Sequence, residues 1–172
     1  LRAGLEELLA GEALQTGARE ELSTLVHQTL RLTGIIEDLL LLSRMDAGRL
    51  KLDLAPIDLT PLIEASLDDL GAVPDALELQ VETDFPTTLM IAGEKRYTSL
   101  ILQNLLENAR KYNLPGGRVR VVAQTAGDDA VVTVANTGRG IPAAAQPHIF
   151  ERFHRGGMGE NVPGYGLGLN LA

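Results

Sequence analysis

Residues 104–112, with the sequence Asn-Leu-Leu-Glu-Asn-Ala-Arg-Lys-Tyr, most constrain what this chain can fold into. The stretch has no Gly or Pro and contains strong helix formers, so it predicts an α-helix. At the helical period of about 100° per residue, its side chains divide into two faces. The apolar face consists of Leu102, Leu105, Leu106 and Ala109. The polar face consists of Asn104, Glu107, Asn108, Lys111 and Tyr112. One face is therefore predicted to enter a core and the other to meet solvent or a ligand.

The polar face suits a nucleotide. Asn104 and Asn108 stand one turn apart although Asn is a poor helix former. An amide oxygen is a hard ligand for Mg²⁺, which takes few protein ligands beside water and phosphate oxygens. Lys111 can meet a phosphate as a point charge, and Tyr112 offers a flat ring to a base. The alternative is a solvated polar face near the end of a helix.

Two glycine clusters follow this helix, at residues 136–142 and 164–169, with an aromatic and basic segment at residues 149–155 between them. Each cluster alone indicates a turn more often than a phosphate loop. In this order, after an N-x-x-x-N-x-x-K-Y helix, they resemble the N, G1, F and G2 boxes of the ATP-binding domain of sensor histidine kinases. The superfamily also includes gyrase, mismatch-repair and chaperone ATPases. The resemblance covers roughly residues 57–172 and extends to the helices before them.

The resemblance implies ATP and Mg²⁺ as cofactors and assigns a role to individual residues. Asn108 would hold Mg²⁺ directly, with Asn104 close to the waters of the metal or to the phosphates. Lys111 would meet a phosphate, and Tyr112 would pack on the nucleoside. The full predicted nucleotide site is Asn104, Asn108, Lys111, Tyr112, Asn136, Gly138, Gly140, Ile141, Arg155, Gly164, Gly166, Leu167 and Gly168.

Asn136 departs from the family pattern, which usually has Asp at this position to accept a hydrogen bond from the adenine amino group. An Asn carbonyl can accept the same bond, but as a neutral acceptor it is expected to be weaker. Some metal-responsive sensor kinases also have Asn here, so the resemblance points to that branch. The alternative is a simple turn residue. Gly138 and Gly140 are expected to let the backbone pass close to the adenine, where a side chain would clash.

The second glycine cluster is expected to lead into a helix that starts near Leu167, whose backbone N–H groups suit phosphate oxygens. Residues 154–163 are predicted to form a mobile lid. Arg155 is the candidate for a lid cation that reaches the terminal phosphate, or else a solvated charge. Phe150 and Phe153 are expected to pack in a core and to anchor the near end of the lid.

The N-terminal part is predicted to be a helical hairpin, with helices at residues 1–10 and 19–45. Its apolar stripe is too wide for one hairpin to bury, which favours pairing of two copies into a four-helix bundle. The run at residues 38–48 resembles the end of the dimerisation and phosphotransfer hairpin of the same kinases. The phosphoacceptor His of that family would fall upstream of Leu1, so no catalytic residue is expected in this chain. His27 lies on the second helix and is interpreted as a surface or bundle histidine.

Composition limits the partners. The net charge is −8 and the pI is about 4.8, which argues against nucleic acid or an anionic membrane surface as the main partner. There is no Cys, which excludes disulfides and thiol chemistry. No apolar run is long enough to span a membrane. Cytoplasmic location is expected, with any membrane contact made only through other segments of a parent anchored in the bacterial inner membrane.

The predicted fold is α+β in two domains, a helical hairpin at residues 1–52 and an α/β sandwich ATP-binding domain of the histidine kinase/gyrase type at residues 53–172. In the second domain, Thr60 and Pro61 predict a helix start, with Thr60 as the cap. Residues 50–54, 77–82, 88–92, 119–123 and 131–134 are predicted as strands. They are expected to form one mixed sheet of about five strands with helices on one face.

The predicted function is the kinase core of a two-component sensor, in which the γ-phosphoryl of ATP goes to a His and then to an Asp of a response regulator. One alternative is an ATP-hydrolysing clamp or chaperone of the same superfamily. Those ATPases place a Glu one turn before the metal Asn as a general base for water, whereas Asn104 cannot accept a proton. Another alternative is a dimerisation module that only binds nucleotide.

Overall fold

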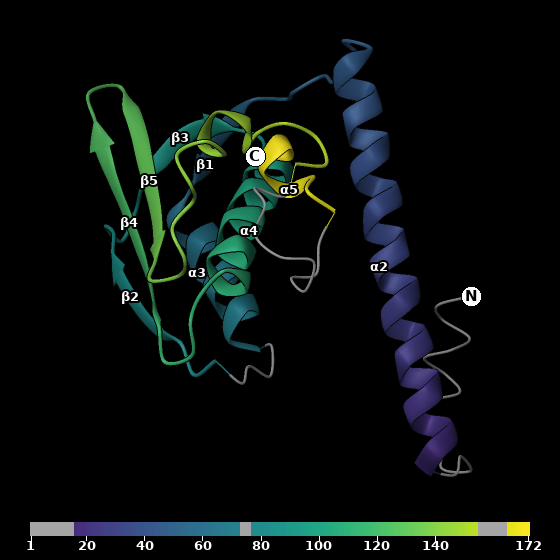
Figure 1. Cartoon of the computed structure of the whole chain (residues 1–172). Helices are drawn as coiled ribbons and strands as arrows, with labels where there is room; N and C mark the ends of the chain where they lie inside the picture. The colour runs from purple at the N-terminus through teal and green to yellow at the C-terminus, as the bar shows by residue number, and fades with distance from the viewer. Residues whose placement is uncertain (1–15, 73–76, 155–164) are drawn as a thin grey trace. The chain divides into compact units, whose positions relative to one another are not determined.

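The computed structural model describes residues 16–72, 77–154 and 165–172 (Figure 1). The chain divides into two compact units, Leu1–Leu50 and Lys51–Ala172. The predicted helix at residues 1–10 lies outside the described residues.

The first unit contains one long described helix, α2, at Thr16–Asp46. Gly48 follows with a φ of +60° and donates its N–H to the carbonyl of Met45 at 3.0 Å, so a glycine in the left-handed region ends the helix. Several large apolar side chains of α2 are exposed: Leu25, Leu30, Leu32, Ile36, Leu39, Leu40 and Met45. Among the described helices, none is long and apolar enough to cross a membrane.

The second unit begins with β1 (Ala55–Asp58), α3 (Thr60–Ala72), β2 (Gln80–Asp84) and β3 (Met90–Gly93). It continues with α4 (Lys95–Lys111), β4 (Arg118–Ala126) and β5 (Asp129–Asn136). A short 3₁₀ turn at Gln146–His148 and the one-turn helix α5 at Gly168–Leu171 follow. The described elements thus agree with the predicted α+β order, although residues 51–54 form no strand and β1 begins at Ala55.

The five strands form two sheets and not the single mixed sheet that the sequence predicted. β1 pairs antiparallel with β3, while β2 pairs parallel with β4, which pairs antiparallel with β5. β4 and β5, which contain the predicted strands at residues 119–123 and 131–134, form a hairpin, and Gly127 at its turn has a φ of +65°. Alternation of apolar residues predicts a strand but not its neighbour, so the division into two sheets could not be predicted from that pattern.

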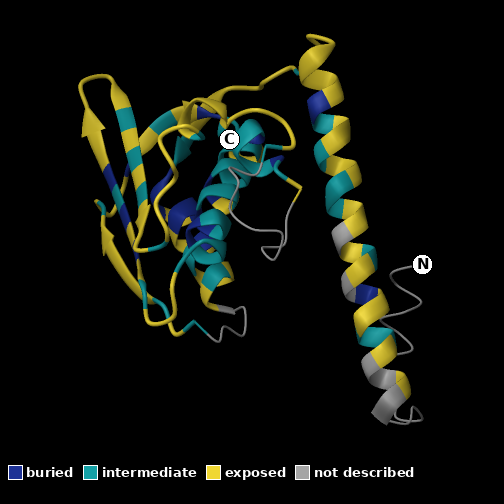
Figure 2. Ribbon diagram, viewed as in Figure 1, coloured by how far each residue is buried: buried dark blue, intermediate teal, exposed yellow. Residues whose placement is uncertain are grey.

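The core lies between the strands and the two long helices α3 and α4, which cover one face (Figures 1 and 2). The buried core residues are Leu59, Leu62, Ile63, Leu89, Leu102, Leu106, Ala109, Val119, Val121 and Ala123. β4 points Val119, Val121 and Ala123 inward, as strand periodicity requires. The buried face of α4 is the predicted one, with Leu102, Leu106 and Ala109 inside. This packing fixes the rotation of α4 and therefore the direction of its polar face.

The start of α3 differs from the prediction in its cap. The Asp58 carboxylate, and not the Thr60 hydroxyl, accepts the N–H of Thr60 at 3.1 Å and also the N–H of Leu89 at 2.9 Å. The Thr60 hydroxyl instead donates to the carbonyl of Pro86 at 2.9 Å and is buried. The sequence could not show this because Pro86 lies 26 residues away.

Candidate functional site

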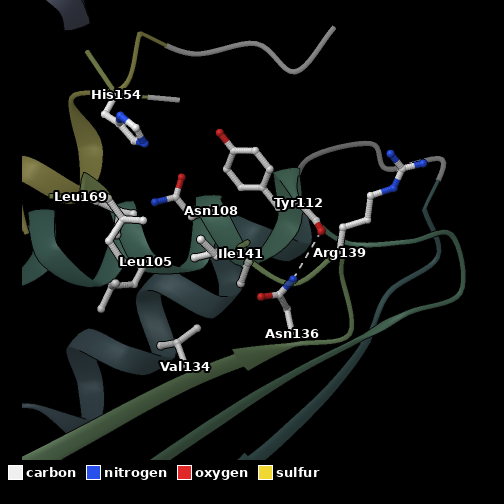
Figure 3. Close-up of a pocket in the computed structure, with 11 residues that line it drawn as sticks. Leu105, Asn108, Tyr112, Val134, Asn136, Arg139, Ile141, His154 and Leu169 are labelled. Carbon is white, nitrogen blue, oxygen red and sulfur yellow. Dashed lines mark hydrogen bonds between the residues drawn. The ribbon is translucent and has the colours of Figure 1, made fainter. Parts of the chain in front are cut away.

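A pocket of about 240 Å³ opens between α4, the end of β5 and the segments that follow it (Figure 3). α4 contributes Leu105, Asn108, Ala109 and Tyr112, and β5 contributes Val134 and Asn136. The remaining lining residues are Arg139, Ile141, Ile149, His154 and Leu169. Apolar walls with a few convergent polar groups are typical of small-molecule sites.

Four of the predicted site residues line this pocket: Asn108, Tyr112, Asn136 and Ile141. They come from three separate segments of the chain. Within the described residues, no hydrogen bond engages the Asn108 amide, which leaves its oxygen open to a ligand. Arg155 and Gly164 lie outside the described residues.

Asn136 is held against the end of α4. Its Nδ2 donates to the main-chain carbonyl of Tyr112 at 3.4 Å, a long hydrogen bond (Figure 3). Tyr112 is the C-cap residue of α4, where the helix has no further N–H for this carbonyl. The bond therefore joins the end of β5 to the end of α4 at the pocket wall.

Gly138 completes this contact. A Cβ built on Gly138 would overlap the Tyr112 carbonyl oxygen and would lie 2.5 Å from Asn136 Nδ2. Residue 138 must therefore be glycine because its backbone lies against the Tyr112 carbonyl of the same chain. Gly140 differs, because a Cβ there would have no atom within 4 Å. The expectation that both glycines pass close to adenine stays a prediction.

A second set of hydrogen bonds also connects the end of β5 to the end of α4. The Thr137 hydroxyl donates to Asn113 Oδ1 at 3.0 Å and accepts the N–H of Arg118 at 2.8 Å. Asn113 Nδ2 donates to the carbonyl of Arg118 at 3.1 Å. The loop after α4, the start of β4 and the end of β5 are thereby connected, so the position of Asn136 is determined by three elements.

Asn104 does not line the pocket. A Cβ built on Gly168 at the start of α5 would lie 2.7 Å from Asn104 Oδ1, so the amide fits under a position where only glycine leaves room. Asn104 Nδ2 is buried and has no hydrogen-bond partner among the described residues. Asn104 thus contacts Gly168 of the second glycine cluster, and its predicted place beside the waters of the metal or the phosphates stays a prediction.

Lys111 is paired with Glu107 and is not among the pocket residues. Its ammonium lies 3.2 Å from Glu107 Oε1, and the Arg110 guanidinium lies 2.9 Å from the same oxygen. Burial acts to raise the pKa of the Glu107 carboxyl, but hydrogen bonds and charge from Arg110 and Lys111 outweigh it and leave that pKa below its ordinary value. Lys111 would have to leave this carboxylate to reach a phosphate.

The prediction that Phe150 and Phe153 pack in a core is wrong, since their side chains are 60% and 62% exposed. Phe153 also has a φ of +61°, which is uncommon for a non-glycine residue. Its N–H donates to the carbonyl of Gly166 at 2.9 Å. Gly166 has a φ of +70°, and a Cβ there would lie 2.6 Å from the carbonyl oxygen of His154. The two ends of the segment predicted as a lid are therefore held together at their base.

His154 is a pocket residue that the sequence reasoning missed. Its Nε2 is buried and has no hydrogen-bond partner in the part of the chain that the structure describes, and its ring lies 5.7 Å from that of His148. His148 Nδ1 in turn contacts Glu151 Oε1 at 2.7 Å, and this hydrogen bond lowers the pKa of the exposed Glu151 carboxyl. His154 lies within the aromatic and basic segment at residues 149–155, but the resemblance assigned it no contact with the nucleotide.

The remaining missed lining residues are apolar except Arg139: Leu105, Ala109, Val134, Arg139, Ile149 and Leu169. Leu105 and Ala109 were assigned to the core face of the helix. Ala109 is buried in the core and also borders the pocket, whereas Leu105 is only half-buried and lines the pocket. Residues one turn before Asn108 and Tyr112 lie directly beside them on a helix. Helical spacing was therefore a usable signal for these two.

The arrangement fits a magnesium-bound nucleotide. Asn108 and Asn136 each offer an amide oxygen at the pocket, and neither oxygen is hydrogen-bonded within the described residues. Within the described ranges, no group of three or more His, Cys, Asp or Glu side chains could hold a metal. A site with one protein oxygen suits Mg²⁺ that keeps its waters and binds phosphate, rather than a metal in a protein cage.

Residues 93–172 match a protein family described as "Histidine kinase-, DNA gyrase B-, and HSP90-like ATPase". The chain is 37% identical to the probable sensor histidine kinase TcrY of Mycobacterium tuberculosis over 155 aligned residues. The alignment covers 88% of this chain and 31% of TcrY. The chain thus spans about a third of the length of this curated relative.

Two solved structures are also similar. The mycobacterial sensor histidine kinase MprB is 30% identical, with a TM-score of 0.59, over 69% of this chain and 74% of that chain. The structure of full-length ShkA in complex with AMPPNP has a TM-score of 0.73 at 26% identity and covers 99% of this chain and 37% of that chain.

Proposed function

This chain belongs to the sensor histidine kinase family, and we propose that its pocket binds Mg-ATP as the phosphoryl donor of a two-component sensor. The observation that supports this most is that Asn108 of α4 and Asn136 of β5, predicted from separate motifs, line the same pocket. ShkA, a similar protein, was solved with the ATP analogue AMPPNP. The phosphoryl group would pass to a His and then to an Asp of a response regulator.

The proposed roles follow from the placement of each side chain. Asn136 Oδ1 accepts the adenine amino group, Tyr112 and Ile141 cover the base, and Asn108 is the protein ligand of Mg²⁺. The metal would neutralise phosphate charge and orient the γ-phosphoryl group for transfer. Gly166, Leu167 and Gly168 turn the chain beside Asn104, and Lys111 approaches a phosphate after leaving Glu107. Gly140, Arg155 and Gly164 complete the proposed nucleotide contacts.

Transfer is favoured over hydrolysis by the surroundings of the nearest carboxylate on α4. Glu107 is paired with Arg110 and Lys111 and faces a different hollow, which is lined by Ser66, Asp69 and Gln103 among others. A carboxylate held by two cations, with a lowered pKa, is a poor base for activating water. Asn104 cannot serve instead, because an amide accepts no proton at neutral pH.

Finer assignments stay proposals. The assignment to the metal-responsive branch of the sensor kinases depends on Asn136 alone. The names of the relatives described above do not support that assignment. A division into a hairpin at residues 1–52 and an ATP-binding domain at residues 53–172 is proposed from the sequence. Location in the cytoplasm, under a membrane-anchored parent, is proposed from the family.

We expect this chain to bind Mg-ATP without labelling itself. Its histidines are His27 on α2, followed by Gln28, and His148 and His154 near the pocket, and none precedes a carboxylate in a His-Glu-Leu-Arg-like context. Calorimetry with Mg-ATP measures binding, and incubation with γ-labelled ATP measures acid-labile label. The absence of any binding would refute the proposed function. Label that disappears in His27→Gln would show that the phosphoacceptor has been misplaced.

We propose that α2 mediates a parallel homodimer through its exposed apolar stripe. Leu25, Leu32, Ile36 and Leu39 recur at the spacing of one helix face, and Leu32 and Ile36 are 59% and 57% exposed. Light scattering at micromolar concentration should give the mass of a dimer for the native chain, and of a monomer for Ile36→Glu. Glu37→Lys, an exposed position outside the stripe, is the matched control and should remain dimeric. A native chain that stays monomeric at 100-fold higher concentration contradicts the proposal.

A further inference from the structure

One carboxylate on α4 holds two cations, and one of them is the lysine proposed to approach a phosphate. The Arg110 guanidinium donates two hydrogen bonds to Glu107, from Nε to Oε2 at 3.0 Å and from Nη2 to Oε1 at 2.9 Å. The Lys111 ammonium lies 3.2 Å from the same Oε1. The side chain of Glu107 is 40% exposed and that of Lys111 is 24% exposed, so both charges are partly withdrawn from water.

Lys111 stands between two different surroundings on α4. It follows Glu107 by four residues and Asn108 by three, and both spacings make neighbours on a helix surface. Asn108 lines the pocket proposed for Mg-ATP, whereas Glu107 lines a separate hollow of about 270 Å³ between α3 and α4. The ammonium is held on the side of Glu107, but its flexible four-carbon stem begins beside the pocket.

The carboxylate cannot accompany Lys111 into the pocket, because the two hydrogen bonds from Arg110 hold it in place. An ammonium that moves to a phosphate therefore loses its contact with Glu107. A phosphate that instead shared the ammonium with Glu107 would bring two anions close together, which is unfavourable. In either case the carboxylate opposes the binding of a phosphate by Lys111.

We infer that Glu107 competes with the nucleotide phosphates for Lys111 and so weakens the binding of phosphate-bearing nucleotides. This inference rests on the proposed nucleotide-binding function. Glu107 is a positioning residue in this account, since it acts on the ligand only through Lys111. Its effect should be absent for adenosine, which has the same base and sugar but no phosphate. The contact between Glu107 and Lys111 forms again when the nucleotide leaves, so it also favours release of the nucleotide.

Calorimetric titration with Mg-ATP and with adenosine tests the competition in the native chain, in Glu107→Gln and Lys111→Met, and in the double variant. We expect Glu107→Gln to bind Mg-ATP about 2- to 5-fold more tightly than the native chain, the range for a partly exposed ion pair. Its affinity for adenosine should equal the native value, which a purely structural effect on the pocket would change. With Lys111→Met already present, Glu107→Gln should give no gain.

Asp69→Asn is the matched control. It removes the same charge from the same hollow, and within the described residues Asp69 forms no ion pair with Lys111. Its affinity for Mg-ATP should equal the native value. An equal gain in Asp69→Asn would show that general charge repulsion, and not competition for Lys111, sets the affinity, and would overturn the inference.

The other outcomes separate the inference from the proposed function. An unchanged affinity of Glu107→Gln for Mg-ATP overturns the inference, and a lower affinity shows that the carboxylate instead holds Lys111 ready for the phosphate. A gain that persists with Lys111→Met also overturns it. In each of these cases the native chain still binds Mg-ATP and the proposed function stands. A native chain that binds no Mg-ATP contradicts the proposed function itself.

Discussion

Replacing Gly138 with alanine is expected to remove ATP binding and to destabilise the second unit by about 2–3 kcal/mol, as overpacking of a closed site does. The new methyl group would overlap the Tyr112 carbonyl oxygen and press on Asn136 Nδ2. Since α4 is fixed by its buried face, the turn after β5 has to move. That movement breaks the bond from Asn136 to Tyr112 and displaces Arg139 and Ile141 from the pocket wall.

Urea unfolding and calorimetric titration with Mg-ATP measure the two effects separately. We expect the affinity to fall by at least about 100-fold, because a displacement on the order of 1 Å is enough to disrupt a polar constellation. Gly140→Ala is the control, since its Cβ has open space and the stability of that variant should be unchanged. A Gly138→Ala variant as stable as Gly140→Ala would show that the close approach is not rigid.

Gly138 and Gly140 belong to one sequence motif but differ in what surrounds them. The motif order marked both residues, and the pattern of the first glycine cluster predicted a turn at the pocket. The sequence could not show which glycine is required by the fold, because the atom that excludes a side chain at residue 138 belongs to Tyr112, at the end of another element. Such requirements arise only from tertiary contacts.

The polar face of α4 illustrates the same limit in a different way. Helical periodicity predicted which side is buried, and it is the side with Leu102, Leu106 and Ala109. It did not predict that the polar residues on the opposite side face two different pockets. Asn108 and Tyr112 line the pocket, whereas Glu107 holds Lys111 toward another hollow. The i, i+4 spacing of Glu107 and Lys111 is itself a sequence signal for an ion pair on one face of a helix.

Phe150 and Phe153 are exposed although apolar residue type predicts burial. Large apolar side chains are usually buried, and the sequence predicts core packing for Phe150 and Phe153. Residues 137–154, however, contain only a short 3₁₀ turn, so no long element presents a second apolar face against which these rings could pack. Asn170 Nδ2 donates to the carbonyl of Phe150 at 2.8 Å, so the backbone of this segment is anchored while its rings remain outside.

Replacing Asn108 with alanine is expected to remove the magnesium dependence of ATP binding and to weaken Mg-ATP affinity by roughly 100-fold or more, since a direct ligand counts for more than the 10- to 100-fold typical of outer-shell groups. Asn108 lines the pocket, and its amide forms no hydrogen bond within the described part of the chain. The fold should therefore survive the substitution, with a change in unfolding free energy of about 0.5 kcal/mol or less.

The decisive measurement is the ratio of ATP affinity with Mg²⁺ to ATP affinity with EDTA. In the native chain this ratio should be large, and in Asn108→Ala it should approach one, because adenine contacts at Asn136 and Tyr112 persist while the metal loses its protein ligand. Gln103→Ala, an exposed position on the same helix outside the pocket, should keep the native ratio. If Asn108→Ala keeps it too, the metal is held elsewhere, and the role assigned to the second asparagine of the motif is wrong. A variant that loses ATP binding equally in EDTA would instead place Asn108 against the nucleotide itself, because a pure metal ligand has no effect once the metal is removed.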